Sequence, residues 1–374
     1  MKKVPSIVVG IDLGNTSFKA VRLQKKGNQY ALARVALLPN PRNPQDQTLP
    51  TEQVLAGLIN EIGGLVKTSG AEVHLTVNSL NSTVRSNVEL PNMTLDELRS
   101  ALKLNSATYL RQNFENYTFD PYPLDAEAAA ALMSNKKTGK KGGAGAAHGK
   151  IKALVTGIDT AEAILYFHAA RRGGIRPRSL QLTAVSLINA FEVAQPEVMA
   201  TQAVGLLDMG YFSSWFTILD RGKPLLVRPV QIGGKNITDY LAQMTSTDFA
   251  KAETTKLQGE GNLAEALARI CVPLIREVRG NINFFEKDSD QAISKIYLSG
   301  AAMRSKVVAE ALSTDIGVIC EPWNAAGGLA IELPPDQQDL FEKNQATFAA
   351  AIGVARSACS DGVTAATPVS VAVV

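Results

Sequence analysis

Two segments of this sequence resemble each other, and their repetition constrains the fold more than any other feature. The first, VVGIDLGNTSFKAVRL, is an apolar strand that ends in Asp-x-Gly and continues into a second strand. The second, VGLLDMGYFSSWFTIL, has the same form and begins about 195 residues later. Helical patterns follow both segments. A duplication of this kind predicts two similar α/β lobes that face each other.

The length and composition fit such a chain and exclude several other classes. At about 150 residues per domain, the 374 residues correspond to two or three domains. A hydrophobic fraction of 45% and a charged fraction of 20% are typical of globular proteins and exclude a wholly disordered chain, a fibre and a small disulfide scaffold. The net charge of 38 − 35 = +3 gives no broad basic surface for nucleic acid and leaves only a local basic patch open.

The cysteines and histidines are few and far apart. Three cysteines without a CxxC pair do not make a disulfide framework, and reduced thiols are the simpler interpretation. Without a cluster of histidines and cysteines, a zinc site is not expected. These residues are Cys271, Cys320, Cys359, His74, His148 and His168.

The N-terminal segment MKKVPSIVVGIDLGNT places two lysines before an apolar stretch, as a signal peptide does. Pro5, Gly10 and Asp12 interrupt the stretch, and no small-residue cleavage site follows, so it is too short for a secretory core. No uninterrupted run of about 18 apolar residues occurs elsewhere in the sequence. We therefore expect a cytoplasmic protein without a membrane span.

Hydrophobic spacing predicts the main helices, and composition marks two irregular segments. Residues 136–150 are rich in Lys, Gly and Ala, which predicts a flexible insertion. The alternative is a contact between its five lysines and phosphate or acidic lipid. The tail, residues 357–374, is expected to be frayed. Helices are expected over residues 51–69, 95–110, 263–285 and 341–355.

The loops that follow the two similar strands carry groups suited to a polyphosphate. Their backbone N–H groups and hydroxyls can bind phosphate oxygens, and glycine allows close approach. If the loops face each other, Asp12 and Asp208 converge, and two carboxylates beside a polyphosphate suit hydrated Mg²⁺. The alternative is that the glycines only make tight turns. The candidate phosphate-binding residues are Gly14, Asn15, Thr16, Ser17 and Lys19 in the first loop, and Gly210 and Ser213 in the second.

Two further glycine-rich turns lie in the second half of the chain. Gly233 and Gly234 precede a predicted helix, and Gly300 and Ala301 follow a short apolar strand. Small residues at a strand-to-helix turn leave room for a flat base or a sugar. The alternative for each turn is close packing of a helix on a sheet.

In this order, the motifs resemble those of the actin/Hsp70/hexokinase-like ATPase superfamily. The two phosphate loops correspond to GIDLGNTSFK and LLDMGYFSS, and the adenosine segment to YLSGAAMRS. AVSLINAF resembles the connecting helix of these proteins, and FAAAIGVAR resembles the closing helix. The resemblance implies an α/β, actin-like, two-lobed ATPase fold with duplicated ribonuclease H-like lobes and a small α/β subdomain inserted in lobe I.

Within that superfamily, the chain most resembles the PilM family of type IV pilus assembly, over roughly residues 5–356. VRSNVELPNMTLDELRSALKLNSATYL resembles the inserted subdomain of that family, and PVQIGGKNITDYL and AKAETTKL resemble segments of its second lobe. The resemblance implies two lobes, an inserted subdomain and a tail. Lobe I covers 1–200 with the inserted subdomain at about 72–172, lobe II covers 201–356 with a last helix at about 341–356 that returns to lobe I, and the tail covers 357–374.

The resemblance also implies roles for particular residues. Asp12 and Asp208 hold a magnesium–phosphate unit, and Glu253 and Lys256 match the Glu-x-x-Lys pair that grips ribose. Without the resemblance, a surface ion pair on one helix face is the simpler interpretation of that pair. The implied nucleotide-binding residues are Gly14, Asn15, Thr16, Ser17, Lys19, Gly210, Ser213, Gly233, Gly234, Glu253, Lys256, Gly300, Ala301 and Arg304.

The sequence departs from the superfamily pattern at two places. Ala301 and Ala302 stand where paired glycines are usual, and Tyr211 and Phe212 stand where small residues are commoner. In-line attack on a terminal phosphate needs a group that orients water. The connecting segment offers three candidates for that role, and the sequence places none of them at the phosphate. We therefore expect ATP binding with slow or no turnover. These candidates are Gln181, Thr183 and Ser186.

By resemblance, the protein is an ATP- and Mg²⁺-binding scaffold, recruited to the inner face of the cytoplasmic membrane by the N-terminal cytoplasmic peptide of a PilN-like partner. A groove of the inserted subdomain would bind that peptide. The alternatives are an FtsA-like division protein and a small-molecule kinase, and a type II secretion platform would use the same architecture. Candidate groove residues, which could equally form the subdomain core, are Val88, Leu90, Leu98, Leu102 and Leu104.

Overall fold

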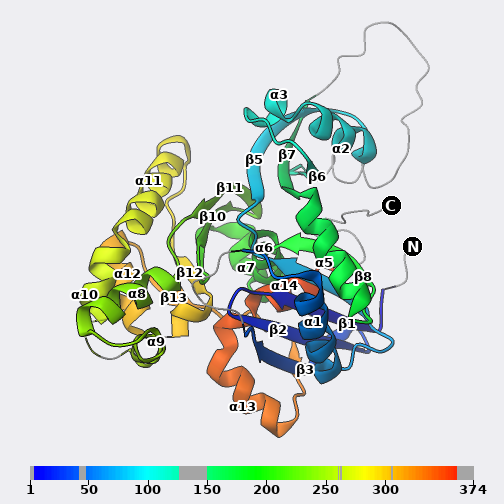
Figure 1. The fold of residues 1–374 in the computed structure, drawn as a ribbon. Coiled ribbons are helices and arrows are strands. Elements are labelled where there is room, and N and C mark those ends of the chain that lie inside the picture. The colour runs from blue at the N-terminus through cyan, green and yellow to red at the C-terminus, as the bar shows by residue number, and fades with distance from the viewer. Residues whose placement is uncertain are drawn as a thin grey trace, which may run out of the picture.

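The computed structural model of the chain describes residues 4–41, 48–125, 150–259, 261, 263–304 and 306–359. Most of the Lys/Gly/Ala-rich segment and of the C-terminal tail therefore lies outside the described residues. The chain forms two large sheets and one small sheet, with helices packed on each (Figure 1). Within the described part of the chain, no helix is both long enough and apolar enough to cross a membrane.

The first large sheet has six strands in the order β14-β3-β2-β1-β4-β8. Its central strand, β1, runs antiparallel to β2 and parallel to β4, so the first repeated segment forms the expected hairpin. The helices α1 and α5 pack together against this sheet, as do α6 and α14. The elements are β1 (Ile7–Leu13), β2 (Ser17–Lys26), β3 (Gln29–Pro39), α1 (Glu52–Val66), β4 (Glu72–Val77), α5 (Thr160–Arg172), β8 (Pro177–Leu182), α6 (Thr183–Ala194), α7 (Pro196–Thr201), β14 (Ala330–Ile331), α13 (Pro335–Asn344), η2 (Gln345–Thr347) and α14 (Ala349–Arg356).

The second large sheet repeats the plan of the first. Its order, β11-β10-β9-β12-β13, corresponds strand for strand to β3-β2-β1-β4-β8, with the same antiparallel hairpin and the same parallel neighbour. The internal repeat that the sequence shows is therefore a repeat of whole sheets. The elements are β9 (Ala203–Met209), β10 (Ser214–Asp220), β11 (Lys223–Val230), α8 (Gly234–Thr245), α9 (Phe249–Gln258), α10 (Leu263–Ile270), α11 (Val272–Asp288), β12 (Ile296–Ser299), η1 (Ala301–Arg304), α12 (Lys306–Ile316) and β13 (Cys320–Pro322).

The small sheet has three antiparallel strands in the order β5-β7-β6, and its strand β5 packs beside β11 of the second large sheet (Figure 1). We expected the insertion to begin at about residue 72 and end at about residue 172. The structure instead places β4 inside the six-stranded sheet and packs α5 against α1, because both carry apolar faces that the core of that sheet buries. The elements of the small subdomain are β5 (Ser82–Pro91), α2 (Leu95–Leu104), α3 (Ser106–Leu110), β6 (Tyr117–Pro123) and β7 (Lys150–Asp159).

Two expected helices are divided in the structure. The helix expected over 263–285 breaks between α10 and α11, where Pro273 lies in the first turn of α11 and has no backbone N–H to continue α10. The last helix, expected from residue 341, is split by the short 3₁₀ turn η2 into α13 and α14.

The closing helix α14 is fixed to the six-stranded sheet by close backbone contacts. A Cβ atom at Gly353 would lie 1.7 Å from the carbonyl oxygen of Ser186 in α6. A Cβ atom at Gly10 in β1 would lie 2.1 Å from the carbonyl oxygen of Ala351 in α14. Only glycine allows these approaches, and they bring the end of the described chain back beside its first strand.

Candidate functional site

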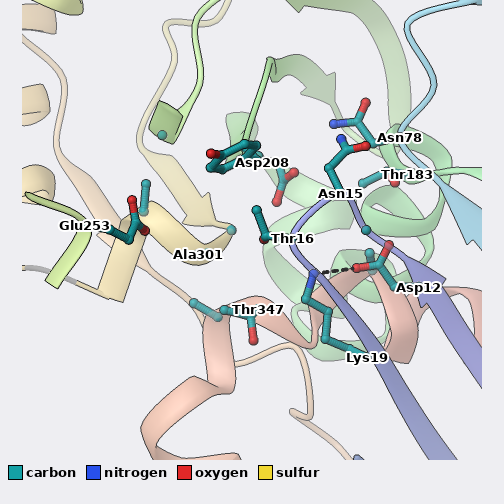
Figure 2. A pocket seen from close by; sticks show the side chains of 18 of the residues that line it. Asp12, Asn15, Thr16, Lys19, Asn78, Thr183, Asp208, Glu253, Ala301 and Thr347 are labelled. Carbon is teal, nitrogen blue, oxygen red and sulfur yellow. Dashed lines mark hydrogen bonds and ion pairs between the residues drawn. The ribbon is translucent and has the colours of Figure 1, made fainter. Parts of the chain in front are cut away.

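A cavity lies between the two large sheets, at the loops that follow their equivalent strands (Figure 2). Residues from at least eight separate stretches of the chain meet there. Most of them are small or polar. The lining residues are Asp12, Gly14, Asn15, Thr16, Lys19, Asn78, Thr183, Asp208, Gly210, Tyr211, Gly234, Phe249, Glu253, Lys256, Gly300, Ala301, Ala302, Ala346, Thr347 and Ala350.

Two buried carboxylates face this cavity from equivalent strands. Asp12 lies near the end of β1 and forms an ion pair with Lys19, with 3.1 Å between Asp12 Oδ2 and Lys19 Nζ. Asp208 lies near the end of β9, and its Oδ1 accepts a 2.7 Å hydrogen bond from Ser299 Oγ. Burial raises the pKa of Asp208 to about 6, the hydrogen bond from Ser299 opposes that shift, and the charge of Asp12 adds to it. A cation in the cavity would relieve the unfavourable burial of both charges.

The first loop is shaped by Asn40, a residue that sequence reasoning did not single out. The backbone N–H of Asn40 donates to the carbonyl oxygen of Thr16 at 2.9 Å, and its Nδ2 donates to the carbonyl oxygen of Asn15 at 3.0 Å. A Cβ atom at Gly14 would lie 2.6 Å from the carbonyl oxygen of Ser17, so only glycine fits this turn. These contacts hold the loop so that Gly14, Asn15 and Thr16 line the cavity.

The second loop is shaped by the start of α8. The N–H of Gly210 donates to the carbonyl oxygen of Ser213 at 3.1 Å, and the N–H of Gly234 donates to the carbonyl oxygen of Gly210 at 2.9 Å. A Cβ atom at Gly233 would lie 2.4 Å from the carbonyl oxygen of Tyr211. Ser213 and Gly233 thus shape the loop, whereas Gly210 and Gly234 line the cavity.

The pair Glu253–Lys256 is not the surface ion pair that spacing alone suggests. The Lys256 side chain is only 3% exposed. Its Nζ donates to Glu253 Oε2 at 2.6 Å, to Thr238 Oγ1 at 2.8 Å and to the carbonyl oxygen of Gly234 at 3.0 Å. Lys256 therefore ties α9 to the start of α8 and fixes the carboxylate of Glu253 at the cavity wall.

The turn after β12 closes the cavity at its other end. Gly300 has φ +98°, and a Cβ atom there would lie 2.3 Å from the carbonyl oxygen of Met209. Its N–H donates to the carbonyl oxygen of Ala346 at 3.1 Å, which brings η2 against the turn. Ala301 and Ala302 line the cavity, so their methyl groups and the neighbouring Ala346 give this end an apolar surface. The side chain of Arg304 lies outside the described part of the structure.

The second half of the chain matches a known protein family. The family model described as "Type IV pilus assembly protein PilM" matches residues 169–358, which is 190 of 374 positions. The chain belongs to the PilM family. The match covers the connecting helix α6, the whole second sheet and the closing helix α14.

The fold of this PilM-family chain is also found in solved structures. A "PilM-PilN type IV pilus biogenesis complex" superposes with a TM-score of 0.77 at 22% identity, over 94% of this chain and 98% of that one. This confirms the expected fold class, an actin-like two-lobed ATPase fold. Two further similarities have TM-scores below one half. They are the ethanolamine utilization protein EutJ from Carboxydothermus hydrogenoformans, with TM-score 0.48, 13% identity and coverages of 95% and 91%, and component A of (R)-2-hydroxyglutaryl-CoA dehydratase from Acidaminococcus fermentans, with TM-score 0.44, 11% identity and coverages of 96% and 99%.

The structure separates the three residues that sequence analysis offered for orienting water in this PilM-family chain. Thr183 lines the cavity. Ser186 Oγ donates to Thr76 Oγ1 at 2.9 Å, and Gln181 binds Asn189 and Ser357 through its side-chain amide. Gln181 and Ser186 therefore belong to a buried network behind the cavity, and Thr183 alone of the three faces the cavity.

Of the sixteen candidate site residues, the structure brings twelve to the cavity and leaves three elsewhere. Ser17, Ser213 and Gly233 do not line it, and Arg304 cannot be placed by its side chain. Sequence reasoning missed Asn78, although a polar residue that ends a strand beside β1 is a signal for this edge of the sheet. It also missed Phe249, which lies one helical turn before Glu253 on α9. The twelve are Asp12, Gly14, Asn15, Thr16, Lys19, Asp208, Gly210, Gly234, Glu253, Lys256, Gly300 and Ala301.

The inserted subdomain buries most of the residues considered for a peptide groove. Val88, Leu90, Leu98 and Leu102 are at most 8% exposed and form its core, so they cannot line an open groove. Leu104, in contrast, is 87% exposed at the end of α2. The alternative interpretation, a subdomain core, is therefore correct for four of the five.

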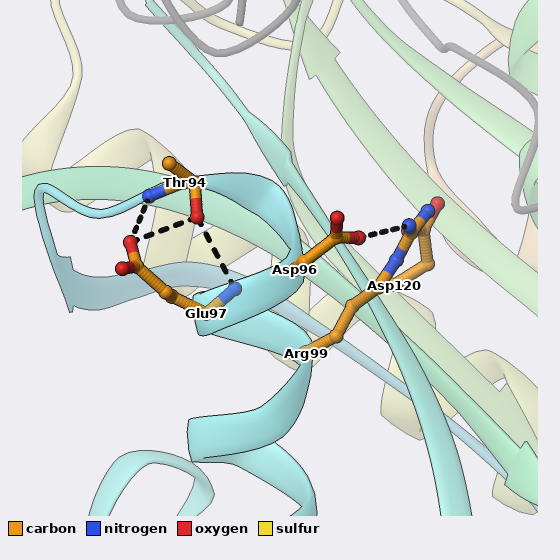
Figure 3. A network of polar contacts seen from close by, with 5 residues as sticks. All are labelled: Thr94, Asp96, Glu97, Arg99 and Asp120. Carbon is orange, nitrogen blue, oxygen red and sulfur yellow. Dashed lines mark hydrogen bonds and ion pairs between the residues drawn. The ribbon is translucent and has the colours of Figure 1, made fainter. Parts of the chain in front are cut away.

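A network of hydrogen bonds and ion pairs connects helix α2 to strand β6 (Figure 3). Thr94 and Glu97 form a capping box at its start. Arg99 Nε and Nη2, on α2, donate to Oδ1 of Asp120, on β6, at 2.9 and 2.6 Å. Burial raises the pKa of Asp120 to about 6, and Arg99 opposes that shift. These contacts hold α2, with its exposed Leu104, at a fixed position on the small sheet.

Proposed function

We propose that this protein is a Mg-ATP-binding scaffold of type IV pilus assembly. The single observation that carries the proposal is the convergence of two buried carboxylates, Asp12 and Asp208, with glycine-containing loops in one cavity between duplicated sheets. Carboxylates and phosphate-binding turns in one cavity suit a nucleotide polyphosphate with its metal ion. Membership in the PilM family favours a scaffold over a division protein or a small-molecule kinase.

The residues present fit a nucleotide along the length of the cavity. The phosphates would contact the turns at Gly14 and Gly210, where a side chain would intrude. The ribose would contact Glu253, whose position Lys256 fixes. The base would lie on the apolar surface of Ala301 and its neighbours.

Magnesium fits the two carboxylates on chemical grounds. Among the described residues, no group of three or more His, Cys, Asp or Glu side chains could hold a metal ion. Mg²⁺ usually takes one or two protein carboxylates and completes its shell with water and substrate phosphate. When bound, it would neutralise phosphate charge, and Asp12 and Asp208 would hold it through direct or water-mediated contacts.

We propose that turnover is slow. Thr183 is the only one of the three connecting-segment candidates at the cavity, and a neutral hydroxyl is a weak proton acceptor. Its contribution to hydrolysis would therefore be to orient water rather than to remove a proton. This fits a protein that uses the nucleotide to hold a conformation.

The proposed partner is the N-terminal cytoplasmic peptide of a PilN-like membrane protein, which would recruit the scaffold to the cytoplasmic face of the membrane. The support is family membership and the similarity to a PilM-PilN complex. The inserted subdomain would contribute the exposed end of α2, with Leu104, rather than the four leucine and valine side chains of its core. The alternative is a related type II secretion platform, which would use the same architecture.

Titration calorimetry with Mg-ATP tests the nucleotide part of the proposal. We expect saturable binding by the intact chain and a loss of at least about tenfold in affinity for Asp208→Asn, since that change removes one of the proposed metal-holding charges. The matched control is Asp288→Asn, because Asp288 is exposed on α11 and does not line the cavity. Equal affinities in all three proteins would remove Asp208 from the site. The absence of binding by the intact chain would refute the proposed function.

A further inference from the structure

Asn78 lies on the cavity wall, and its side-chain amide is bonded to the opposite lobe. It follows β4 of the six-stranded sheet, and its Oδ1 accepts a 2.9 Å hydrogen bond from Nε1 of Trp215 in β10. The indole N–H can only donate, so the atom that receives it must be the amide oxygen. This contact fixes the orientation of the Asn78 amide, because the oxygen and nitrogen of an amide are told apart by their hydrogen-bond partners.

The amide nitrogen of Asn78 is consequently available to a ligand. A Cβ atom built on Gly210 would lie 3.1 Å from Asn78 Nδ2, which places this nitrogen beside the second phosphate loop. Among the described residues, no acceptor for the two N–H groups of Nδ2 is found. Asn78 therefore presents two unused hydrogen-bond donors at the cavity, next to a turn that suits phosphate.

Thr183 supplies a second polar group without a partner in the same part of the cavity. It is 5% exposed, and its Oγ1 has no hydrogen-bond partner among the described residues. It is the first residue of α6, a helix of 12 residues whose N-terminus carries no side-chain cap. A buried hydroxyl without a partner is costly in a folded protein unless a ligand or water binds it.

The two groups lie at the end of the cavity that is remote from the proposed base and ribose. In Figure 2, Asn78 and Thr183 lie together near Asn15, whereas Glu253 and Ala301 lie on the far side. A nucleotide with its base at Ala301 would direct its phosphate chain towards Asn78. The group that reaches Asn78 would be the outermost phosphate.

We propose that Asn78, oriented by Trp215, and Thr183 form a subsite for the terminal phosphate of a nucleoside triphosphate. The inference rests on the proposed nucleotide binding and adds that the site distinguishes triphosphate from diphosphate. Hydrogen bonds to a charged phosphate oxygen are stronger than those between neutral groups, so loss of these donors selectively weakens the ligand that reaches them. Trp215 is a positioning residue, because it acts only through Asn78.

The bond between Asn78 and Trp215 also joins the two lobes. Asn78 follows a strand of the first sheet, and Trp215 lies in the second sheet. The Asn78 amide therefore keeps its orientation towards the cavity only while the two lobes keep their relative position. Trp215 is 3% exposed, which leaves its indole little freedom to move alone. A ligand that binds Asn78 would therefore stabilise this arrangement of the lobes.

The test compares affinities for Mg-ATP and Mg-ADP in the full chain and its variants. Asn78→Asp keeps an oxygen that can accept from Trp215 but replaces the two donors by a negative charge. We expect it to lower Mg-ATP affinity by about tenfold or more while Mg-ADP affinity changes by less than about threefold. Asn78→Ala should give the same selectivity with a smaller loss. Thr183→Val should lower the affinity for Mg-ATP more than the affinity for Mg-ADP. Thr183→Ser retains the hydroxyl and should have the Mg-ATP affinity of the unaltered chain.

Trp215 gives an independent optical readout. The chain has two tryptophans, so Trp323→Phe leaves Trp215 as the only one and serves as the background protein. Mg-ATP should shift its emission more than Mg-ADP does, and Asn78→Asp should abolish that difference. Trp215→Phe should lower the ratio of ATP to ADP affinity, whereas Trp323→Phe should not.

The outcomes separate this inference from the proposed function. If the unaltered chain binds Mg-ATP and all Asn78 and Thr183 variants keep its ratio of ATP to ADP affinity, the terminal-phosphate subsite is refuted while nucleotide binding stands. If the unaltered chain binds neither nucleotide, both are refuted. Thermal unfolding of each variant without nucleotide shows whether the variant is folded. If Asn78→Ala does not fold, Asn78→Asp, which keeps an acceptor for Trp215, replaces it in the test.

Discussion

Asp12 and Asp208 occupy equivalent positions in the two large sheets, yet different partners hold them. Each faces a hydroxyl residue on the parallel neighbour strand, Thr76 beside Asp12 and Ser299 beside Asp208. On the antiparallel neighbour, the residue opposite Asp12 is Lys19, whereas the residue opposite Asp208 is Trp215. The duplicated sheets have therefore diverged at the site itself. Among the described residues, an ion pair is found for Asp12 and none for Asp208.

The first prediction concerns Lys19, the cation of the first lobe. Both side chains of the Lys19–Asp12 pair are about nine-tenths buried, at 12% and 10% exposure. Lys19→Met leaves the carboxylate of Asp12 buried without its partner, so we expect a loss of about 1–3 kcal/mol in the free energy of unfolding. Denaturant unfolding with and without Mg²⁺ measures this, and Mg²⁺ should restore part of the loss.

The matched control for Lys19→Met is Lys26→Met on the same strand. Lys26 pairs with Glu332 at the surface, with side chains 58% and 39% exposed. Surface pairs of this kind contribute about 0–1 kcal/mol. Equal losses in the two variants would contradict the role given to the buried pair.

The second prediction separates Glu253 from Lys256. Lys256→Met removes a buried donor from three acceptors and should cost about 2–4 kcal/mol of folding stability. Glu253→Gln keeps an oxygen for Lys256 and should cost less, but it should weaken ATP binding by removing the carboxylate proposed for the ribose. Chemical denaturation and calorimetry with ATP and 2′-deoxy-ATP distinguish the two effects. An Lys256→Met protein as stable as the parent would refute the bracing role.

The third prediction follows from the buried Asp120 of the inserted subdomain. Its folded-state pKa is raised to about 6 by burial, whereas an unfolded Asp has a pKa of about 3.9. The folded state therefore binds more protons between these values, so its stability falls as pH rises from about 4 to about 6 and is constant above. Asp120→Asn lacks this proton uptake.

Urea unfolding across that pH range tests the third prediction by difference. The unfolding free energy of the parent minus that of Asp120→Asn should decrease by on the order of 1–2 kcal/mol between pH 4 and pH 6. The matched control is Asp96→Asn, at a side chain that is 89% exposed and that pairs with the same Arg99. A difference for Asp120→Asn that rises with pH would contradict the raised pKa.

The fourth prediction concerns the proposed partner surface. Leu104→Glu changes a side chain that is 87% exposed, so it should leave thermal stability nearly unchanged. We expect it to weaken binding of a PilN-like N-terminal peptide by about tenfold, which fluorescence anisotropy with a labelled peptide would measure. Leu65→Glu on α1, at 49% exposure, is the control. Peptide affinity that is unaffected by Leu104→Glu would place the partner elsewhere.

The sequence predicts those parts of the site that depend on short-range pattern. An apolar strand that ends in Asp-x-Gly locates Asp12 and Asp208, and a three-residue spacing relates Glu253 to Lys256. The order of strands follows from the repeat, because each copy forms the same hairpin with the same parallel neighbour. These features are local or are copied from one lobe to the other.

The remainder depends on contacts between distant segments, which no local pattern records. Asn78 resembles any polar residue at a strand end until Trp215 is brought opposite it. Asn40 lies in a loop whose composition gives no reason to expect that it shapes the turn at Gly14. The burial of Leu98 and the exposure of Leu104 on one short helix likewise depend on which face meets the small sheet.

The most direct test of the central claim is calorimetric titration of the purified chain with ATP and Mg²⁺, in the presence and absence of a synthetic N-terminal peptide of a PilN-like partner. We predict that both ligands bind and that Asp208→Asn abolishes or strongly weakens the ATP isotherm without affecting the peptide isotherm. A change of peptide affinity on saturation with ATP would show that the sites are coupled. Peptide binding without any ATP binding would contradict the account, because the cavity between the sheets would then have no nucleotide to hold.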